Sequence, residues 1–228
     1  MKILAFDTSS EACSVALNLD GQILSRFEHA PRRHTELLLP MIEEMLMEAG
    51  VELGDLDALA FGRGPGSFTG VRIAAGVAQG IAFGADLPVA PVSTLAALAL
   101  RSYREEGKGR LLAAFDARMR EVYWGCFIID DNDRPQLQGC ESVSPPDYVS
   151  LPEGSEWHGV GEGWKVYGDE LNARVGGSIS VSSELTCRAD EIALIGSDMF
   201  EAGDVVTAEH ALPVYLRDEV AWKKQPVS

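Results

Sequence analysis

The sequence has few basic residues, few histidines and no paired cysteines, and each shortage excludes a class of protein. Among 228 residues, 19 Lys and Arg stand against 35 Asp and Glu, giving a net charge of −16. A surface this acidic repels nucleic acid and anionic membranes on average, so contact with RNA requires a local basic patch or a partner protein. The four cysteines form no C-x-x-C pair, which favours reduced, buried thiols and predicts a cytoplasmic protein.

Patterns for a metal site, a catalytic serine or a membrane span are also missing. The four histidines show neither H-x-x-x-H nor H-E-x-x-H spacing, so no metal ligands are predicted. No G-x-S-x-G or Ser-x-x-Lys pattern indicates a catalytic serine. The longest apolar run, around residues 73–85, contains three glycines and a glutamine and is too short to cross a bilayer. We therefore expect a soluble protein that does not contact membranes.

Apolar segments alternate with turn residues along the first half of the chain, as is typical of an α/β protein. A strand over residues 2–7 is followed by two alternating segments around Asp20-Gly21, a hairpin signal. Thr35 is the expected N-cap of the next helix, and Gly50 ends it. Short apolar strands and longer apolar helices then alternate: we expect strands at 56–62 and 88–93, and helices at 71–84 and 95–107, the last capped by Ser93 or Thr94.

The second half repeats this order of elements after the polar stretch 104–110. Three strands are expected within 110–144, followed by a short helix near 164–172 and a clear late helix at 188–203. Two halves that each open with three strands predict duplicated ribonuclease-H-like lobes, although no repeat is visible in the letters themselves. The predicted parts are an N-terminal lobe at 1–105, a C-terminal lobe at 106–207, and a segment at 208–228 that packs back on the lobes.

A glycine-rich loop, RGPGSFTG, joins the strand at 56–62 to the following helix. Free N–H groups at a helix start and the hydroxyl of Ser67 favour an anion here, but a tight strand-to-helix turn would need the same three glycines, Gly64, Gly66 and Gly70. No Lys follows Gly70, so the loop is not a Walker A motif, and its G-x-G-x-x-x-G spacing differs from the dinucleotide fingerprint. Both interpretations remain open at this point.

Asp7 and Thr8 form a second candidate phosphate site at the end of the first strand. A carboxylate in this position could hold a magnesium ion bound to phosphate, and the hydroxyl beside it could donate to an anion. The alternative is that Asp7 caps the junction between the strand and the turn. A single aspartate does not decide between these two roles.

Two helices are more apolar than contact with one core requires. Apolar residues of the helix at 36–49 spread over roughly 200° of its circumference, where one core contact needs a stripe of about 100°. In the next helix only Arg72 and Gln79 are strongly polar, and three glycines recur every four residues. These features predict a partner surface made of Leu38, Met41, Ile42, Met45, Ile73, Gly76, Val77, Gly80 and Gly84. The alternative is that the second helix lies between the sheet and the first helix of the same lobe.

Five stretches, in order along the chain, resemble the TsaB (YeaZ) family, the bacterial proteins needed to make threonylcarbamoyladenosine in tRNA. The stretches are ILAFDTSSEACSVAL, RRHTELLLPMI, GRGPGSFTGVRIA, FDARMREVYWG and PVYLRDEVAWKK. The resemblance implies the two-lobe actin/Hsp70/sugar-kinase (ASKHA) fold. It also implies work with a related catalytic subunit, TsaD, and an ATPase, TsaE, which together move threonylcarbamoyl from its adenylate to the adenosine beside the anticodon.

The resemblance further implies that this chain helps catalysis rather than performing it. The catalytic relative carries a metal-binding H-x-x-x-H after a "PV" strand, and here Thr94 and Leu98 occupy those two positions. The family context therefore predicts no catalytic residues, no cofactor of its own, ATP, ADP and metal held by the partner subunits, a homodimer when alone, and tRNA reached through the complex. The two predicted helices would form the contact with TsaD and with a second copy.

Six residues are the candidates for a weak nucleotide or phosphate site that the family resemblance still allows. They are Asp7, Thr8, Gly64, Gly66, Ser67 and Gly70. Two other functions stay as alternatives. One is an active kinase or ATPase of the same fold, for which the later GVGEG stretch would be a second phosphate loop. The other is a metallopeptidase, which the missing ligand spacing disfavours.

Overall fold

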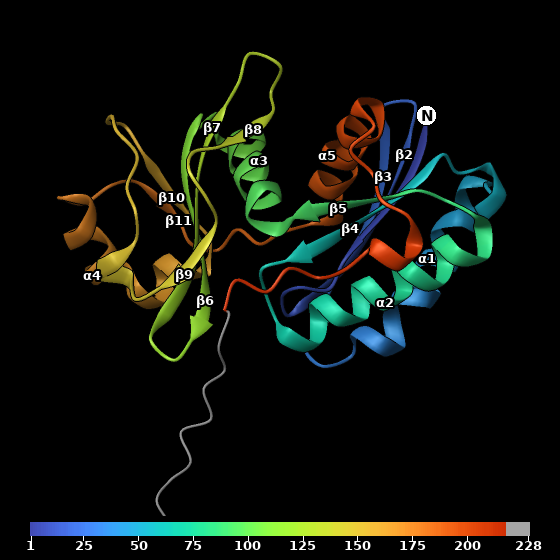
Figure 1. The fold of residues 1–228 in the computed structure, drawn as a ribbon, viewed down its shortest axis with the longest axis horizontal. Helices are drawn as coiled ribbons and strands as arrows, with labels where there is room; N and C mark the ends of the chain where they lie inside the picture. Colours follow the sequence, from blue (N-terminus) through green and yellow to red (C-terminus); the bar gives the residue numbers. More distant parts are fainter. Residues whose placement is uncertain (218–228) are drawn as a thin grey trace, which may run out of the picture.

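The first sheet is built from the N-terminal part of the chain. In the computed structural model, which describes residues 1–217, three antiparallel strands are followed by two that run parallel to the first (Figure 1). They are β1 (Lys2–Asp7), β2 (Ala12–Leu19), β3 (Gln22–His29), β4 (Ala58–Gly64) and β5 (Val89–Ser93), in the order β3-β2-β1-β4-β5. Asp20 and Gly21, with φ of 50° and 94°, make the predicted hairpin turn between β2 and β3.

The second sheet repeats the same topology. Its strands are β6 (Arg110–Arg118), β7 (Glu121–Ile129), β8 (Pro135–Leu137), β10 (His158–Val160) and β11 (Val181–Ser182), with β9 (Ser142–Ser144) paired to β7. The order β8-β7-β6-β10-β11, with β10 and β11 parallel to β6, matches that of the first sheet strand for strand. This confirms the prediction of duplicated ribonuclease-H-like lobes of the actin/Hsp70/sugar-kinase fold.

Helices cover both faces of each sheet. The helices α1 (His34–Ala49) and α2 (Phe68–Ala85) lie on one face of the first sheet, and α5 (Ala189–Ala202) lies on the other (Figure 1). The second sheet packs against α3 (Thr94–Glu106) on one face and α4 (Glu162–Val175) on the other. Three short 3-10 helices complete the fold: η1 (Leu53–Asp55), η2 (Pro146–Tyr148) and η3 (Ala208–His210).

The helices α3 and α5 correct the predicted lobe boundaries. The helix α3 falls in the range 1–105 but packs mainly against β6 and β7 of the second sheet, whereas α5 falls in 106–207 but packs against β1, β4, β2 and β5 of the first. Each half of the chain thus contributes one helix to the packing of the other half's sheet: α3 packs on the second sheet and α5 on the first. Sequence order alone could not show this exchange, because it depends on which apolar faces meet after both sheets have formed.

Residue size differs between the two faces of the first sheet. Because side chains alternate along a strand, Leu4 and Phe6 face α1 and α2, whereas Ile3 and Ala5 face α5. The α5 face is lined largely by alanines: Ala5, Ala16, Ala58, Ala60 and Ala90. Small side chains let α5 approach the sheet closely, and the larger side chains on the other face fill the space beneath two helices.

Side-chain caps begin two of the helices, and of these only the α3 cap was predicted, at Ser93 or Thr94. Ser67 accepts a hydrogen bond from the N–H of Gly70 at 3.3 Å at the start of α2, and Ser93 accepts from the N–H of Ala96 at 3.1 Å at the start of α3. The Thr35 cap is wrong, because α1 already begins at His34. Its N-cap position is held by the preceding arginine, whose side chain makes no capping bond.

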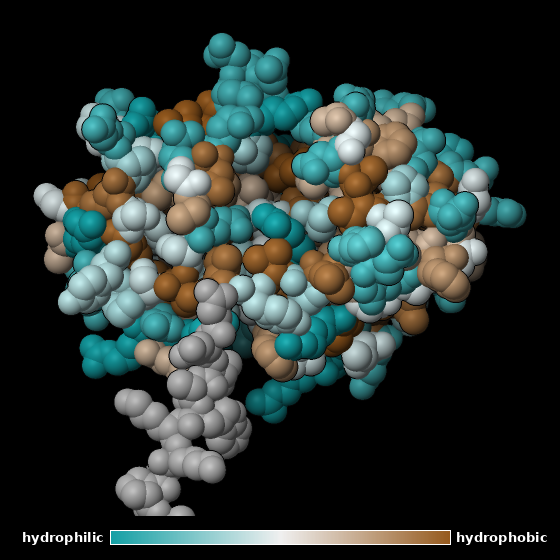
Figure 2. All heavy atoms as spheres, viewed as in Figure 1, coloured by the Kyte–Doolittle hydropathy of each residue, from teal (hydrophilic) through white to brown (hydrophobic). Residues whose placement is uncertain are grey.

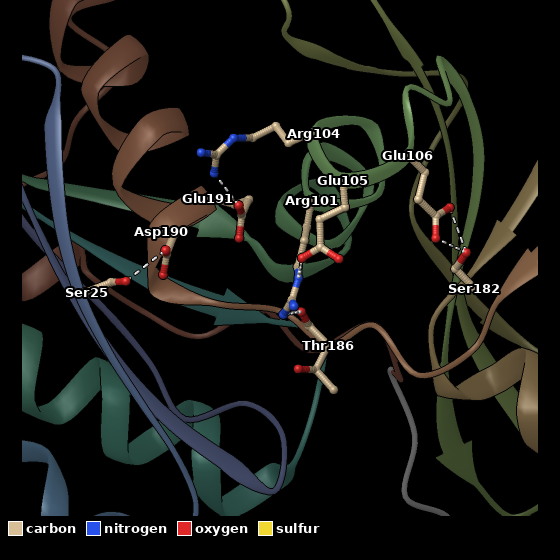
Figure 3. Close-up of polar contacts among 9 residues, drawn as sticks. All are labelled: Ser25, Arg101, Arg104, Glu105, Glu106, Ser182, Thr186, Asp190 and Glu191. Atoms are coloured by element: carbon tan, nitrogen blue, oxygen red, sulfur yellow. Dashed lines mark hydrogen bonds and ion pairs between the residues drawn. The ribbon is translucent and has the colours of Figure 1, made fainter.

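The last turns of α3 tie the two lobes together. Arg101 donates to the backbone oxygen of Thr186 at 3.0 Å, in the segment that leads into α5 (Figure 3). One turn later, Arg104 forms an ion pair with the buried carboxylate of Glu191 at the start of α5 (Figure 3). These contacts fix the direction in which the exchanged helix α5 leaves the second lobe.

The described part of the C-terminal segment runs back over both lobes. The N–H of Val214 donates to the backbone oxygen of Arg63 at 2.9 Å, beside the glycine loop. Arg217 then donates to the backbone oxygen of Ala117 at 3.2 Å and forms an ion pair with Glu121, both in the second lobe. The predicted segment 208–228 continues beyond this point, and residues 218–228 lie outside the described residues.

Candidate functional site

The glycine loop is packed tightly against the turn that follows β1. A Cβ atom on Gly70 would lie 1.8 Å from the backbone oxygen of Thr8, and one on Gly66 would lie 2.6 Å from that of Ser9. The hydroxyl of Thr8 donates to the backbone oxygen of Gly70 at 2.7 Å, and the N–H of Ser67 donates to that of Ser9 at 2.7 Å. Close contact between two backbone segments therefore accounts for both glycines without any bound anion.

Asp7 lies at the end of β1 and is almost completely buried, at 1% exposure. One carboxylate oxygen, Oδ2, accepts hydrogen bonds from the N–H of Ser9 at 3.2 Å and from its hydroxyl at 3.0 Å. The other, Oδ1, has no partner among residues 1–217 and lies against Gly62, where a Cβ atom would come within 2.0 Å of it. Burial raises the pKa of Asp7 from 3.8 to about 7. The carboxyl thus holds the turn after β1 through its two hydrogen bonds with Ser9.

Thr94 and Leu98 are the two residues that the resemblance aligns with a relative's metal ligands. Both side chains are completely buried. The hydroxyl of Thr94 donates to the backbone oxygen of Pro65 at 2.5 Å, and Leu98 lies against the backbone of Gly161. Both positions serve the packing of α3 between the lobes, and among residues 1–217 no three His, Cys, Asp or Glu side chains gather as metal ligands would.

The GVGEG stretch of the second lobe is explained by packing in the same way. A Cβ atom on Gly161 would lie 2.4 Å from the backbone oxygen of Ala114 on β6, and one on Gly163 would lie 2.8 Å from the Cβ of Ala114. A Cβ atom on Gly159 would lie 2.6 Å from the ring of Trp164. Gly161 and Gly163 allow a close approach to β6, and Gly159 makes room for the ring of Trp164. Packing therefore accounts for all three glycines without phosphate binding.

A polar cluster around His158 connects α3 to β10 and β11. The sequence had indicated no role for this histidine. The buried ring of His158 contacts the hydroxyl of Ser180 through Nδ1 at 2.6 Å and that of Ser182 through Nε2 at 2.9 Å. Glu106 lies 3.0 Å from the same Nε2 and accepts a hydrogen bond from Ser182 (Figure 3). Ser182 and Glu106 therefore share Nε2, and Ser180 lies on the opposite ring nitrogen, Nδ1. These contacts connect α3 to the part of the second lobe that contains β10 and β11.

The glycine stripe of α2 faces outward. Gly76, Gly80 and Gly84 are exposed, and a Cβ atom at any of them would have no neighbour within 4 Å. Ile73 and Val77 lie beside the stripe and are half-buried against the core. By length and composition α2 would also suit a bilayer span, a test that packed helices of soluble proteins pass as well. No part of residues 1–217 covers these three glycines, so the alternative in which the stripe is buried within the lobe is wrong.

The α1 part of the predicted partner surface needs correction. Leu38, Met41, Ile42 and Met45 are 1–8% exposed and pack against the sheet with Leu4 and its neighbours. Their wide apolar arc reflects contact with both the sheet and α2, so these four side chains belong to the core of this chain. A partner would have to meet the opposite side of α1, which carries its glutamates.

Exposed apolar residues that the sequence analysis passed over flank the glycine stripe or lie on α1. Phe68 and Phe83 of α2 are 66% and 85% exposed, and Met47 of α1 is 79% exposed. The guanidinium of Arg72 lies over the ring of Phe68, 3.2 Å from its centre, and near the ring of Tyr215 from the C-terminal segment. Figure 2 shows one face of the molecule as a mosaic of separate hydrophobic and hydrophilic patches. Sequence could have indicated Phe83, one residue before Gly84, because it adjoins the stripe.

Comparisons with known proteins place the chain among the tRNA-modification proteins. A family model described as TsaD, tRNA N6-adenosine threonylcarbamoyltransferase, matches residues 26–223. The tRNA threonylcarbamoyladenosine biosynthesis protein TsaB of Escherichia coli (strain K12) is 47% identical over 99% of this chain and 99% of its own length. The TsaB protein of Haemophilus influenzae is 40% identical over 99% of this chain and 98% of its own length.

A solved structure gives the same result for the fold. YeaZ from Pseudomonas aeruginosa superimposes with a TM-score of 0.90 at 48% sequence identity, covering 94% of this chain and 99% of the other. Identity at this level over nearly the whole length means that the relatives share the two interlocked lobes. The superposition covers nearly all of both chains, so the region of α2 is also part of it.

Proposed function

Because this chain belongs to the TsaB family of tRNA threonylcarbamoyladenosine biosynthesis proteins, we propose that it is the non-catalytic subunit of a tRNA-modifying transferase. It binds and supports a TsaD-like catalytic subunit, together with a TsaE-like ATPase, while threonylcarbamoyl moves from its adenylate to the adenosine beside the anticodon. ATP, ADP and metal belong to the partner subunits. The chain reaches tRNA through the complex, in the cytoplasm, and forms a homodimer when alone.

The observation that carries this proposal is the open glycine stripe on α2. Glycine inside a helix costs about 0.5–1 kcal/mol relative to alanine. Among residues 1–217 no atom approaches Gly76, Gly80 or Gly84 closely enough to explain this cost. A helix from a partner could come close to the stripe, with Phe68 and Phe83 as large apolar contacts at its sides. Ile73 and Val77 would add to the buried area.

The packing around the glycine loop and Asp7 supports a helping role over a catalytic one. The glycines of both loops are used in contacts within the chain, and Asp7 is buried with its pKa raised to about 7. Thr94 and Leu98, at the positions of the relative's metal ligands, are committed to packing. A partner that supplies the nucleotide and metal sites would complete the machinery.

The test is Gly80→Arg in the purified chain. In the monomer the new arginine stays in water, so circular dichroism and the melting temperature should remain near those of wild type. In the complex it would be buried without a partner, which costs several kcal/mol, so binding to the TsaD-like subunit and self-association should both be lost. Formation of threonylcarbamoyladenosine in a reconstituted system should fall with them.

A matched control is Gly168→Arg, on α4 of the other lobe, where a side chain also meets open space. This variant should fold, bind and support modification like wild type. If Gly80→Arg folds and still binds the TsaD-like subunit, the partner surface lies elsewhere and the proposal for α2 fails.

The non-catalytic role has its own test. The isolated chain, incubated with ATP and magnesium, should release phosphate no faster than buffer in a malachite-green assay. Asp7→Ala is the control that separates true activity from contamination, since Asp7 directly precedes the residues that contact the glycine loop. Phosphate release that survives repurification and disappears in Asp7→Ala would support the alternative of an active ATPase or kinase.

A further inference from the structure

The hydrogen bonds around His158 determine which of its ring nitrogens carries the hydrogen. Ser182 donates its single hydroxyl hydrogen to the carboxylate of Glu106, whose two oxygens lie 2.6 and 2.7 Å away (Figure 3). The hydroxyl oxygen of Ser182, 2.9 Å from Nε2, and the carboxylate, 3.0 Å from the same nitrogen, can therefore only accept from the ring. Nε2 thus carries the hydrogen, and Nδ1 of the neutral ring is left to accept one.

Ser180 lies on the accepting side of this ring. Its hydroxyl oxygen is 2.6 Å from Nδ1 and therefore donates to it. Ser180 is exposed, whereas the ring of His158 is buried. A hydroxyl and a carboxylate on opposite nitrogens of one imidazole is the order of a nucleophile, its general base and the group that orients the base. The three residues lie far apart in the sequence, so no local pattern marks them.

The fold holds this arrangement and keeps the ring neutral. The N–H of Gly159 on β10 donates to the backbone oxygen of Ser180 at 2.9 Å, so the serine is anchored beside the strand that carries His158. Burial is the largest cause that lowers the pKa of His158 from its ordinary value of 6.5. Lys108 acts in the same direction, and Glu106 acts against them. At pH 7 the ring is therefore neutral, and Nδ1 is available as a base.

An open hollow of about 420 Å³ lies beside Ser180 and His158, which both line it. This volume falls in the range of small-molecule sites, about 300–1,000 Å³. The lining also includes two cations, Lys108 and Arg110, and one carboxylate, Glu156. Acyl transfer places negative charge on the carbonyl oxygen of the substrate, and an excess of positive charge favours that step. The hollow thus suits a small ester whose carbonyl carbon meets the exposed hydroxyl.

We propose that Ser180 is a nucleophile that accepts the acyl group of small activated esters, with His158 as its general base and Glu106 as the residue that positions the ring. The oxygen of Ser180 forms a bond to the carbonyl carbon of the ester while its proton passes to Nδ1. The bond from this carbon to the leaving oxygen then breaks, and the leaving alcohol takes the proton from Nδ1. The products are O-acylated Ser180 and one alcohol. This site lies in the second lobe, whereas the proposed partner surface lies on α2 of the first.

Acetylation of the purified full chain by 4-nitrophenyl acetate tests the proposal. All samples carry Cys140→Ser, because an exposed thiol also reacts with this ester. Mass spectrometry of the digested protein gives the acetylation rate of each serine. Ser180 should react at least about tenfold faster than Ser178. Ser178 is exposed on the same segment and, within residues 1–217, makes no hydrogen bond to the histidine.

The pH profile and two variants test whether the histidine acts as the base. The rate at Ser180 should rise with pH and level off above the pKa of His158, which lies below 6.5. His158→Gln can still donate and accept hydrogen bonds but offers no base, so the rate at Ser180 should fall to that of Ser178. Glu106→Gln should lower the rate less, since it removes only the charge beside the ring. Circular dichroism confirms that each variant is folded.

Two outcomes would overturn the proposal. Equal rates at Ser180 and Ser178 without either variant would mean that Ser180 only satisfies a buried ring nitrogen, and this result does not depend on any variant folding. A faster rate at Ser180 that is unchanged in folded His158→Gln would mean that His158 is not the base.

Discussion

The helices α2 and α5 cover opposite faces of the same sheet, yet they use glycine in opposite ways. On α5, a Cβ atom at Gly196 would lie 2.4 Å from the Cβ of Ala60, so this glycine lets the helix sit close to the sheet. On α2, a Cβ atom at Gly76, Gly80 or Gly84 would meet no atom of residues 1–217 within 4 Å. A contact within the described residues thus explains the glycine of α5, and no such contact explains the three glycines of α2.

The two faces of the sheet explain this difference. Alanines line the α5 face, and a helix can only exploit such a shallow surface if its own contact residue is small. The other face carries Leu4, Phe6 and similar large residues, which hold α1 and α2 further out and fill the space with side chains. Apolar residues of this lobe therefore occupy two kinds of position. On the inner side of α1 they form the core, and on the outer side of α2 they are exposed.

The largest effect is expected where the inner side of α1 is charged. Met41→Asp buries a carboxylate among apolar side chains, because Met41 is 8% exposed and packs against the sheet. An unpaired buried charge should lower the free energy of unfolding by about 3–5 kcal/mol. Urea denaturation followed by circular dichroism measures this change.

The matched control is Met47→Asp on the same helix, since Met47 is 79% exposed. This variant should change the free energy of unfolding by less than about 0.5 kcal/mol. If Met41→Asp is as stable as Met47→Asp, α1 does not bury the face that the structure shows, and the comparison between core and surface sides of this layer fails.

The pH dependence of stability tests the burial of Asp7 at the end of β1. Burial raises the pKa of Asp7 to about 7 from 3.8, so the folded protein binds this proton more strongly than the unfolded chain does. Stability should therefore fall as pH rises through the window between these two values, and it should level off above about pH 7. Between pH 5 and 8 wild type should lose about 2–3 kcal/mol relative to Asp7→Asn, which cannot ionise.

Denaturation of both proteins at several pH values measures this difference. The amide also changes the free energy of unfolding by an amount that does not depend on pH. This constant does not affect the comparison, which uses only the change in the free energy of unfolding with pH. A difference between wild type and Asp7→Asn that stays flat from pH 5 to 8 would mean that water or a cation reaches the carboxyl.

Local chemistry made much of the fold predictable from sequence. The Asp20-Gly21 hairpin, the cap at Ser93 and the order of elements in both lobes depend on neighbours within a few residues. The exchange of α3 and α5 between lobes was missed, because it depends on long-range packing. The glycine loop was left with two interpretations for the same reason: the atoms that Gly66 and Gly70 approach belong to a turn about 60 residues earlier in the sequence.

The partner surface was predictable in part. Spacing placed Gly76, Gly80 and Gly84 on one face of α2, and that face is outward. The apolar arc of α1 could not be divided into inner and outer sides from the sequence, since both the sheet and α2 contact it. Burial of Met41 and exposure of Met47 become visible only once the sheet fixes the rotation of α1.

An intermediate effect is expected at the close approach of α5. Gly196→Ala adds a methyl group 2.4 Å from the Cβ of Ala60, which forces α5 away from the sheet. Overpacking of this kind costs about 1–3 kcal/mol, and the better helix propensity of alanine offsets up to about 1 kcal/mol of it. A lower free energy of unfolding, by about 1–2 kcal/mol, is the expected result. Relief by Ala60→Gly in the double variant would assign the loss to this one contact.

The smallest effect has the opposite sign and concerns α2. Gly80→Ala adds a methyl group into open space, so the chain gains the helix propensity of alanine, about 0.5–1 kcal/mol, with no clash to offset it. The melting temperature of the monomer should rise by a few degrees, while Gly196→Ala lowers it. Binding to a TsaD-like subunit is the second readout, because a methyl group would separate two backbones that meet at Gly80. A variant that is more stable alone and weaker in the complex would mean that the glycine serves the partner. If Gly80→Ala instead destabilises the monomer, the outer side of α2 is covered within the chain, and the contrast with α5 is lost.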